Sequence, residues 1–211
     1  MRHLDLDPER DAWLYVPQSV DPSKPAPFVL LLHPAGGDAS RFLERFRAAA
    51  DVQGVILLSP ASRAATWDRV NGPFGPDVAF IDRALRQVFT DYSIDRSRLC
   101  IAGFSDGASY ALSLGLTNGD LFTHVIAFSP GFMQPASRTG SPRFFVAHGT
   151  HDEILLIERT GRPIAAELRR AGYKVEYREH EGGHTVTPEL AAEALGEIKN
   201  QRAESRNMPR K

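Results

Sequence analysis

The segment Arg98–Leu112 (RLCIAGFSDGASYAL) decides how the whole chain is interpreted. A short apolar run with β-type residues reaches Gly103, Ser105 follows between two glycines, and an alanine-rich helical pattern comes after Gly107. The pattern G-x-S-x-G in the order strand, tight turn and helix is typical of a nucleophile elbow. Its glycines let strand and helix pass close together, while the strained backbone of the serine pushes the hydroxyl clear of the sheet. The segment therefore predicts Ser105 as a nucleophile, with an ordinary strand-to-helix turn as the alternative.

The composition is that of a soluble globular protein. The chain has 211 residues, of which 42% are hydrophobic and 24% are charged, and its net charge is -1. We expect a single domain over residues 1–200 with a substantial core, followed by a polar tail over residues 201–211. The small net charge indicates neither a nucleic-acid-binding nor a membrane-surface-binding protein. No segment approaches the roughly 18 apolar residues of a membrane span.

Two local features bear on the cellular compartment. The single cysteine, Cys100, excludes an intramolecular disulfide and is expected to be a small buried hydrophobe, because it lies in the apolar strand before the elbow. Residues 1–8 carry charges where a signal peptide would have its apolar run. The sequence therefore favours a cytoplasmic protein, and it carries no signal for an oligomeric state.

Strand and helix patterns alternate along the chain. This alternation predicts right-handed βαβ units and a mostly parallel sheet with helices on both faces. In such a sheet the functional groups gather at the carboxyl ends of the strands. We expect Ser40 to cap the first helix and Ala61–Pro76 to be an irregular connection. Besides the elbow, the expected strands are Ala12–Val16, Phe28–His33, Val55–Ser59, His124–Ser129, Phe144–His148 and Tyr173–His180, and the expected helices are Arg41–Ala50, Asp77–Thr90, Pro163–Ala171 and one that starts at Thr187.

A serine hydroxyl becomes a nucleophile when a histidine, oriented by a carboxylate, takes its proton. Asp152 follows the expected strand that ends at His148, and His184 follows a double glycine after the expected strand that ends at His180. Both residues therefore fall at the carboxyl ends of strands, and they follow Ser105 in the chain order serine, aspartate, histidine.

Other acids and histidines lie nearby. The side chain of Glu153 is expected to point away from that of Asp152 along an extended loop. His148 is expected to end a strand in a backbone-supporting role, His151 to lie on an exposed loop, and His180 to come too early. The sequence thus favours Asp152 and His184 as the partners of Ser105.

The oxyanion of an acyl-transfer intermediate needs two preorganised hydrogen-bond donors. One is expected to be the N–H of Asp106, at a helix N-terminus whose dipole favours negative charge. The other is expected from the loop after Phe28–His33. Pro34 has no N–H, so Ala35 is the first choice and Gly36 the second. A simple glycine-rich turn is the alternative for this loop.

Together these motifs resemble the α/β-hydrolase superfamily from about Trp13 to Lys199. Within it, the chain resembles the small esterases of the phospholipase/carboxylesterase and polyhydroxybutyrate-depolymerase-like groups. The resemblance implies a three-layer α/β sandwich without a large lid, and hydrolysis of a small-molecule carboxylic ester through an acyl-serine, with no cofactor and no metal. The segments that carry it are 31–37 (LLHPAGG), 77–82 (DVAFID), 94–99 (IDRSRL), 103–108 (GFSDGA), 148–152 (HGTHD) and 182–184 (GGH).

The chain departs from the pattern of these families at two positions. Pro34 replaces the glycine usual after that histidine, and Asp106 stands where related enzymes often carry Gln or Asn. A carboxylate beside the oxyanion would oppose the developing charge if it pointed inward, so we expect the side chain of Asp106 to point away.

The substrate is constrained only loosely. Ala61–Pro76 is a modest insertion and no long apolar lid segment is present, which favours an open site and a small or soluble acyl group. Four large side chains on loops either line an acyl pocket or cover the core. A catalytically silent binding module and an acyltransferase are the alternatives to a hydrolase. The four side chains are those of Trp67, Phe74, Phe132 and Met133.

Overall fold

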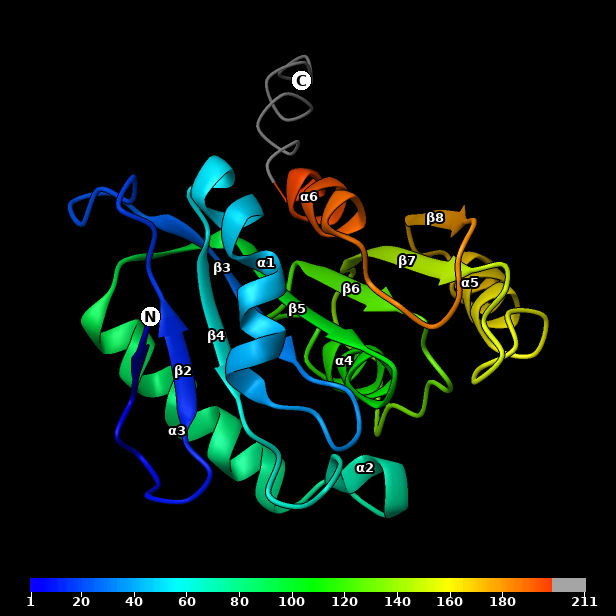
Figure 1. Ribbon diagram of the computed structural model, residues 1–211, viewed down its shortest axis with the longest axis horizontal. Coiled ribbons are helices and arrows are strands. Elements are labelled where there is room, and N and C mark those ends of the chain that lie inside the picture. Colours follow the sequence, from blue (N-terminus) through cyan, green and yellow to red (C-terminus); the bar gives the residue numbers. More distant parts are fainter. Residues whose placement is uncertain (199–211) are drawn as a thin grey trace.

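The computed structural model describes residues 1–198, and its centre is one eight-stranded sheet (Figure 1). The expected tail at 201–211 lies outside the described residues. The strand order is β1-β2-β4-β3-β5-β6-β7-β8, in which the pairs from β4 to β8 are parallel and β1 and β2 are antiparallel. The expected mostly parallel sheet is therefore confirmed. The strands are β1 Arg2–His3, β2 Ala12–Tyr15, β3 Ala26–Leu32, β4 Ile56–Pro60, β5 Ile94–Phe104, β6 His124–Phe128, β7 Arg143–Gly149 and β8 Val175–His180.

Helices cover both faces of the sheet (Figure 1). Side chains alternate between the faces along each strand, so Leu30 and Leu32 join the core under α3, α4 and α5, while Val29 and Leu31 join the core under α1 and α6. All four are fully buried, as the apolar run predicts for a strand covered on both sides. The helices are α1 Ala39–Gln53, α2 Asp68–Asn71, α3 Pro76–Asp91, α4 Asp106–Thr117, α5 Gly161–Arg170 and α6 Pro188–Glu197.

The cap of the first helix differs from the expectation. Helix α1 begins at Ala39, and its N-cap is Asp38, whose Oδ1 accepts a hydrogen bond from the Arg41 N–H at 2.9 Å. Ser40 lies inside the helix and donates its hydroxyl to the same oxygen at 2.6 Å. The prediction of Ser40 as the cap is wrong, because an aspartate two residues earlier satisfies the first turn equally well.

The segment expected to be irregular, 61–76, contains the short helix α2 and is fixed by two aspartates. The N–H of Asp68 donates to Asp77 Oδ2 at 2.7 Å, and the N–H of Asp77 donates to Asp68 Oδ2 at 2.9 Å. The Tyr110 hydroxyl on α4 donates to Asp68 Oδ1 at 3.0 Å. Burial raises the pKa of Asp77 above its ordinary value. The segment is thus tied to α3 and α4 by hydrogen bonds and does not form a large lid.

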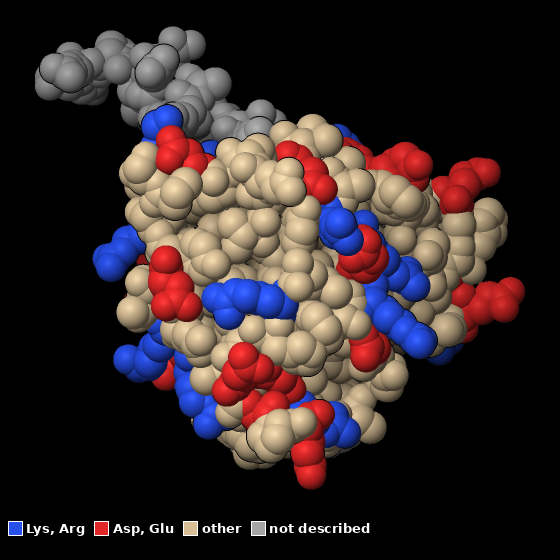
Figure 2. Space-filling view, turned by 60° about the vertical axis from the view of Figure 1, so that its left-hand side comes forward, with Lys and Arg blue, Asp and Glu red and all other residues tan. Residues whose placement is uncertain are grey.

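The remaining sequence expectations concern the surface and the cysteine. Charges of both signs are interspersed on the face drawn in Figure 2, in keeping with a net charge of -1. Cys100 is fully buried, as expected, and burial raises the pKa of its thiol. Within residues 1–198, no helix has the length and apolar character needed to cross a membrane.

Candidate active site

Ser105 stands at the sharp turn between β5 and α4. Its φ of 57° and ψ of -120° are unusual for a residue with a side chain and store about 1–3 kcal/mol of strain. The surrounding hydrogen bonds enforce this conformation: its N–H donates to Phe128 O at 2.9 Å, and its carbonyl accepts from the N–H groups of Ala108 and Ser109 at 3.0 Å each. Backbone strain held in place by neighbouring strands and a helix is typical of a functional residue.

The two glycines of the elbow allow the close approach that the motif requires. A Cβ on Gly103 would lie 2.1 Å from Gly107 O, and a Cβ on Gly107 would lie 2.1 Å from Leu32 O. All these neighbouring atoms are backbone, so no side chain can move aside. The elbow therefore packs directly against the end of β3, from which the expected oxyanion loop continues.

Asp152 and His184 meet at the carboxyl ends of β7 and β8. His184 Nδ1 lies 2.7 Å from Asp152 Oδ2, and Asp152 Oδ1 accepts from the N–H groups of Ile154 and Leu155 at 3.0 and 2.8 Å. Burial opposes the charge of this carboxylate, but the Leu155 N–H and His184 outweigh it and hold the pKa of Asp152 below its ordinary value. Asp152 is therefore an ionised acceptor that orients His184.

His184 also lies beside the elbow. Its ring stands 4.6 Å, centroid to centroid, from the ring of Phe104, the residue before Ser105. Residues 1–198 contain no hydrogen bond between the Ser105 hydroxyl and His184. Such catalytic hydrogen bonds are often long without substrate and shorten when it binds. With Nδ1 occupied by Asp152, the ring nitrogen left for Ser105 is Nε2.

The other nearby acids and histidines are placed differently. Glu153 and His151 are exposed and His180 is half-buried. His148 is fully buried, and its Nε2 lies 2.7 Å from Leu155 O and 3.2 Å from Asp152 Oδ2. The contact with the carboxylate was not expected from the sequence. The sequence does contain one indication of this contact: His148 and Asp152 are four residues apart, on either side of the end of a strand.

The loop after β3 contains an N–H group free to bind an oxyanion. The Gly36 N–H donates to Ala65 O at 2.7 Å, and the Gly37 N–H donates to Pro34 O at 2.9 Å. Within the described part of the chain, the N–H of Ala35 meets no acceptor. Asp106 is the first residue of α4, where an N–H has no partner inside the helix. This arrangement favours Ala35 over Gly36.

The buried side chains of His33 and Trp67 hold this loop in place by hydrogen bonds. The sequence did not predict these hydrogen bonds. His33 Nε2 accepts from the Ser62 N–H at 3.1 Å, so Nδ1 carries the hydrogen and donates to Pro34 O at 2.8 Å. Burial lowers the pKa of His33, which keeps the ring neutral. Trp67 Nε1 donates to His33 O at 2.8 Å, and the Trp67 side chain is fully buried. Of the two alternatives for Trp67, the structure therefore favours the core.

The side chain of Asp106 has a specific partner. Its Oδ2 accepts a hydrogen bond from the Thr66 hydroxyl at 2.7 Å. Thr66 lies in the segment 61–76, which the two aspartates described above anchor. The carboxylate of Asp106 is thus held by a donor, while the N–H of the same residue stays at the start of α4.

The other three candidate pocket residues are all half-buried. Phe74 and Met133 pack against the core under α3–α5. Phe132 follows β6, and the N–H groups of Gly131 and Phe132 donate to Ser109 Oγ at 2.9 and 3.3 Å. Because Ser109 Oγ in turn donates to Ser105 O at 3.1 Å, Phe132 is tied to the elbow. Of the four residues, Phe132 is therefore the one whose backbone is linked by hydrogen bonds to Ser105.

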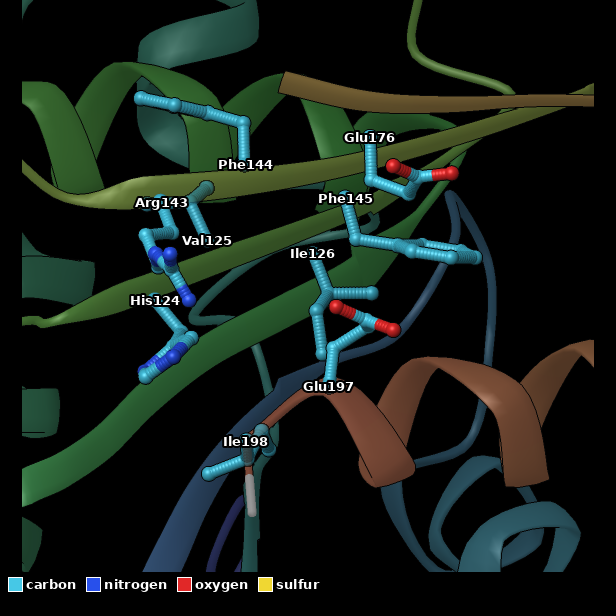
Figure 3. A pocket seen from close by; sticks show the side chains of 9 residues that line it. All are labelled: His124, Val125, Ile126, Arg143, Phe144, Phe145, Glu176, Glu197 and Ile198. Atoms are coloured by element: carbon cyan, nitrogen blue, oxygen red, sulfur yellow. The ribbon is translucent and has the colours of Figure 1, made fainter. Parts of the chain in front are cut away.

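A cavity at the opposite end of the sheet is separate from this site (Figure 3). It lies at the amino-terminal ends of β6 and β7, near His124 and Arg143. Its volume of about 20 Å³ suits a single water molecule. His124 Nδ1 contacts Thr123 Oγ1 at 2.9 Å, and within residues 1–198 its buried Nε2 has no hydrogen-bond partner. Burial, aided by the charge of Arg143, lowers the pKa of His124 to about 4.

The buried His124 predicts a pH-dependent stability. Protonation is easier in the unfolded chain, so stability is fully present above pH 6.5 and declines as the pH falls toward 4. We expect the wild type to lose up to roughly 3 kcal/mol over this interval relative to His124→Asn. Urea unfolding of both proteins at pH 7.5, 5.5 and 4 measures the difference, in which the other buried histidines cancel. Parallel pH dependences would contradict the prediction.

Comparison with known proteins places these features in context. The phospholipase/carboxylesterase family model matches residues 78–198. Feruloyl esterase C from Emericella nidulans is 29% identical over 157 residues, which cover 71% of this chain and 57% of that protein. Acetylxylan esterase from Coprinopsis cinerea is 30% identical over 121 residues, which cover 52% of this chain and 32% of that protein. The chain thus spans little more than half the length of feruloyl esterase C.

Solved structures of esterases share the architecture. The carboxylesterase of Bacillus cereus aligns with a TM-score of 0.68 at 21% identity, covering 91% of this chain and 94% of that one. A ferulic acid esterase from Anaeromyces mucronatus aligns with a TM-score of 0.65 at 20% identity, covering 88% of this chain and 84% of that one. These likenesses show the α/β-hydrolase fold, as expected from the sequence.

Proposed function

The chain belongs to the phospholipase/carboxylesterase family, and on that premise we propose that it hydrolyses carboxylic esters or thioesters through an acyl-serine. The observation that carries the proposal is the hydrogen bond of 2.7 Å between His184 Nδ1 and Asp152 Oδ2, beside a serine with a strained backbone. A buried acid that fixes the tautomer of a histidine next to such a serine supports nucleophilic catalysis.

In the proposed mechanism, Ser105 Oγ attacks the acyl carbonyl while His184 Nε2 takes its proton. Asp152 stabilises the imidazolium, and the N–H groups of Ala35 and Asp106 bind the oxyanion. When the intermediate collapses, the bond to the leaving alcohol or thiol breaks and His184 returns the proton to it. Water then attacks the acyl-serine by the same route and releases the carboxylic acid.

We propose a small or soluble acyl group as substrate. Supporting observations are the anchored segment 61–76, which leaves the site without a large lid, and the names of the relatives, which are feruloyl and acetylxylan esterases. An acetyl or a hydroxycinnamoyl ester is therefore the first substrate class to test. The proposed enzyme is cytoplasmic, a location that cell fractionation tests separately.

A substrate panel tests the function. We expect Ser105-dependent turnover of p-nitrophenyl acetate and of methyl ferulate, with lower kcat/KM for acyl chains of eight or more carbons. A thioester and a lactone in the same panel show which leaving groups are accepted. A fluorophosphonate probe should label Ser105 in the folded protein. Absence of both turnover and labelling would instead favour a catalytically silent binding module.

A further inference from the structure

A second histidine, His148, contacts the carboxylate that orients His184. It is the penultimate residue of β7, and its side chain is fully buried. Its Nε2 lies 2.7 Å from Leu155 O and 3.2 Å from Asp152 Oδ2. A carbonyl oxygen and an ionised carboxylate oxygen are both acceptors. The Nε2 atom of His148 must therefore carry a hydrogen, which it donates to Leu155 O, with Asp152 Oδ2 only 3.2 Å away.

The ring of His148 is neutral and fixed in this tautomer. Burial lowers its pKa, and its Nδ1 has no hydrogen-bond partner in the part of the chain that the structure describes. Gly161, the first residue of α5, closes the space over the ring: a Cβ there would lie 2.5 Å from His148 Nδ1. With backbone packed against one edge and two acceptors at the other, the ring cannot turn without losing its hydrogen bonds.

His148 is one of several groups that face the Asp152 carboxylate. Oδ1 accepts from the N–H groups of Ile154 and Leu155, and Oδ2 lies 2.7 Å from His184 Nδ1 and 3.2 Å from His148 Nε2. The side chain of Ser129 also helps to lower the pKa of this carboxyl. Oδ1 thus faces donors from the loop, and Oδ2 faces a donor from β7. Together these donors fix the plane of the carboxylate. The direction of Oδ2 then decides where His184, which directly follows Gly182 and Gly183, places Nε2.

We propose that His148 is a positioning residue, whose Nε2–H binds Asp152 Oδ2 and Leu155 O together and so holds the carboxylate in the orientation that His184 requires. The inference rests on the proposed esterase function. It assigns His148 no contact with the substrate: the residue acts through Asp152. Loss of the donor should therefore slow the chemical step and leave substrate binding nearly unchanged.

The test compares two substitutions of similar size. His148→Met removes the donor, and we expect kcat to fall about 10- to 100-fold, since small misplacements of catalytic groups have effects of this order. The KM for p-nitrophenyl acetate should stay within about two-fold of the wild type. His148→Gln places an amide N–H near the original Nε2 position and should restore most of the lost kcat. His151→Gln, on the exposed neighbouring histidine, is the matched control and should retain wild-type kcat.

The outcomes separate the proposals. A wild type without Ser105-dependent turnover would overturn the esterase function and the positioning role with it. An active wild type with unchanged kcat in His148→Met, or with equal losses in the Met and Gln variants, would overturn the positioning role alone. If His148→Met does not fold, nitrogen NMR of the wild type decides: a neutral His148 protonated at Nε2 supports the proposal, and a ring protonated at Nδ1 refutes it.

Discussion

Replacing Ser105 with alanine is expected to lower kcat/KM for ester hydrolysis by about 10⁴-fold or more. Without the hydroxyl, no acyl-serine forms, and His184 has no serine proton to accept. The proposed oxyanion donors, the N–H groups of Ala35 and Asp106, remain, so a small residual rate above that of the buffer is expected. Steady-state hydrolysis of p-nitrophenyl acetate, with active-site titration of the wild type, gives the ratio.

The control for Ser105→Ala is Ser137→Ala, because Ser137 is exposed on the connection between β6 and β7. It should match the wild type in activity and in thermal unfolding. Circular dichroism should show that Ser105→Ala is folded, since alanine fills no more space than serine. Turnover that survives Ser105→Ala undiminished would mean that another residue attacks the acyl group.

The second large effect is expected at Gly107. A Cβ at this position would lie 2.1 Å from Leu32 O and 2.5 Å from His33 O, both backbone atoms. Gly107→Ala must therefore push α4 away from the end of β3, and we expect a loss of about 3 kcal/mol, the upper end of the usual cost of overpacking, in the free energy of unfolding. Because the loop that carries Ala35, a proposed oxyanion donor, continues from β3, the remaining folded protein should also lose kcat. Urea unfolding and the ester assay measure the two effects.

Gly196→Ala is the matched control for this substitution. Gly196 lies in α6, and a Cβ there would meet its nearest neighbour, Gln53 Nε2, at 3.8 Å, which is ordinary contact. The same change should stabilise the protein by up to about 1 kcal/mol, since alanine is the better helix former. If Gly107→Ala unfolds at the same urea concentration as the wild type, the close packing of the elbow against β3 is not needed.

The sequence predicted most of the architecture because its signals are local. Apolar runs such as Phe28–His33 identify buried strands wherever they occur, and alternation with helices leads to a mostly parallel sheet. The prediction of the helix cap was wrong for an equally local reason, because two suitable residues lie close together. Asp38 and Ser40 are both good N-caps, and the sequence does not show which one the chain uses. Helix α2 is a single turn in a segment rich in glycine and proline, so no periodic pattern predicts it.

The candidate site could be predicted where it depends on residue type, and not where it depends on distant contacts. Ser105, Asp152 and His184 each follow a recognisable strand, and their catalytic roles stay predictions that the substitutions above test. The two alternatives for Trp67 stayed open in the sequence, because a large aromatic on a loop can face either the core or the solvent. In the structure, Trp67 Nε1 donates to His33 O, 34 residues away, and this contact places the side chain in the core.

The sequence by itself determined the tight turn around Ser105, the order of the strands and helices along the chain, and the chemical types gathered at their ends. Each of these features depends on a few consecutive residues. The tertiary structure decided which atoms meet: Thr66 with Asp106 across 40 residues, the Ser62 N–H with His33 across 29, and His148 with the carboxylate that also holds His184. These contacts form only when the folded sheet brings the ends of its strands together. For that reason the elbow is visible in the sequence, whereas the atoms that orient its partners are visible only in the fold.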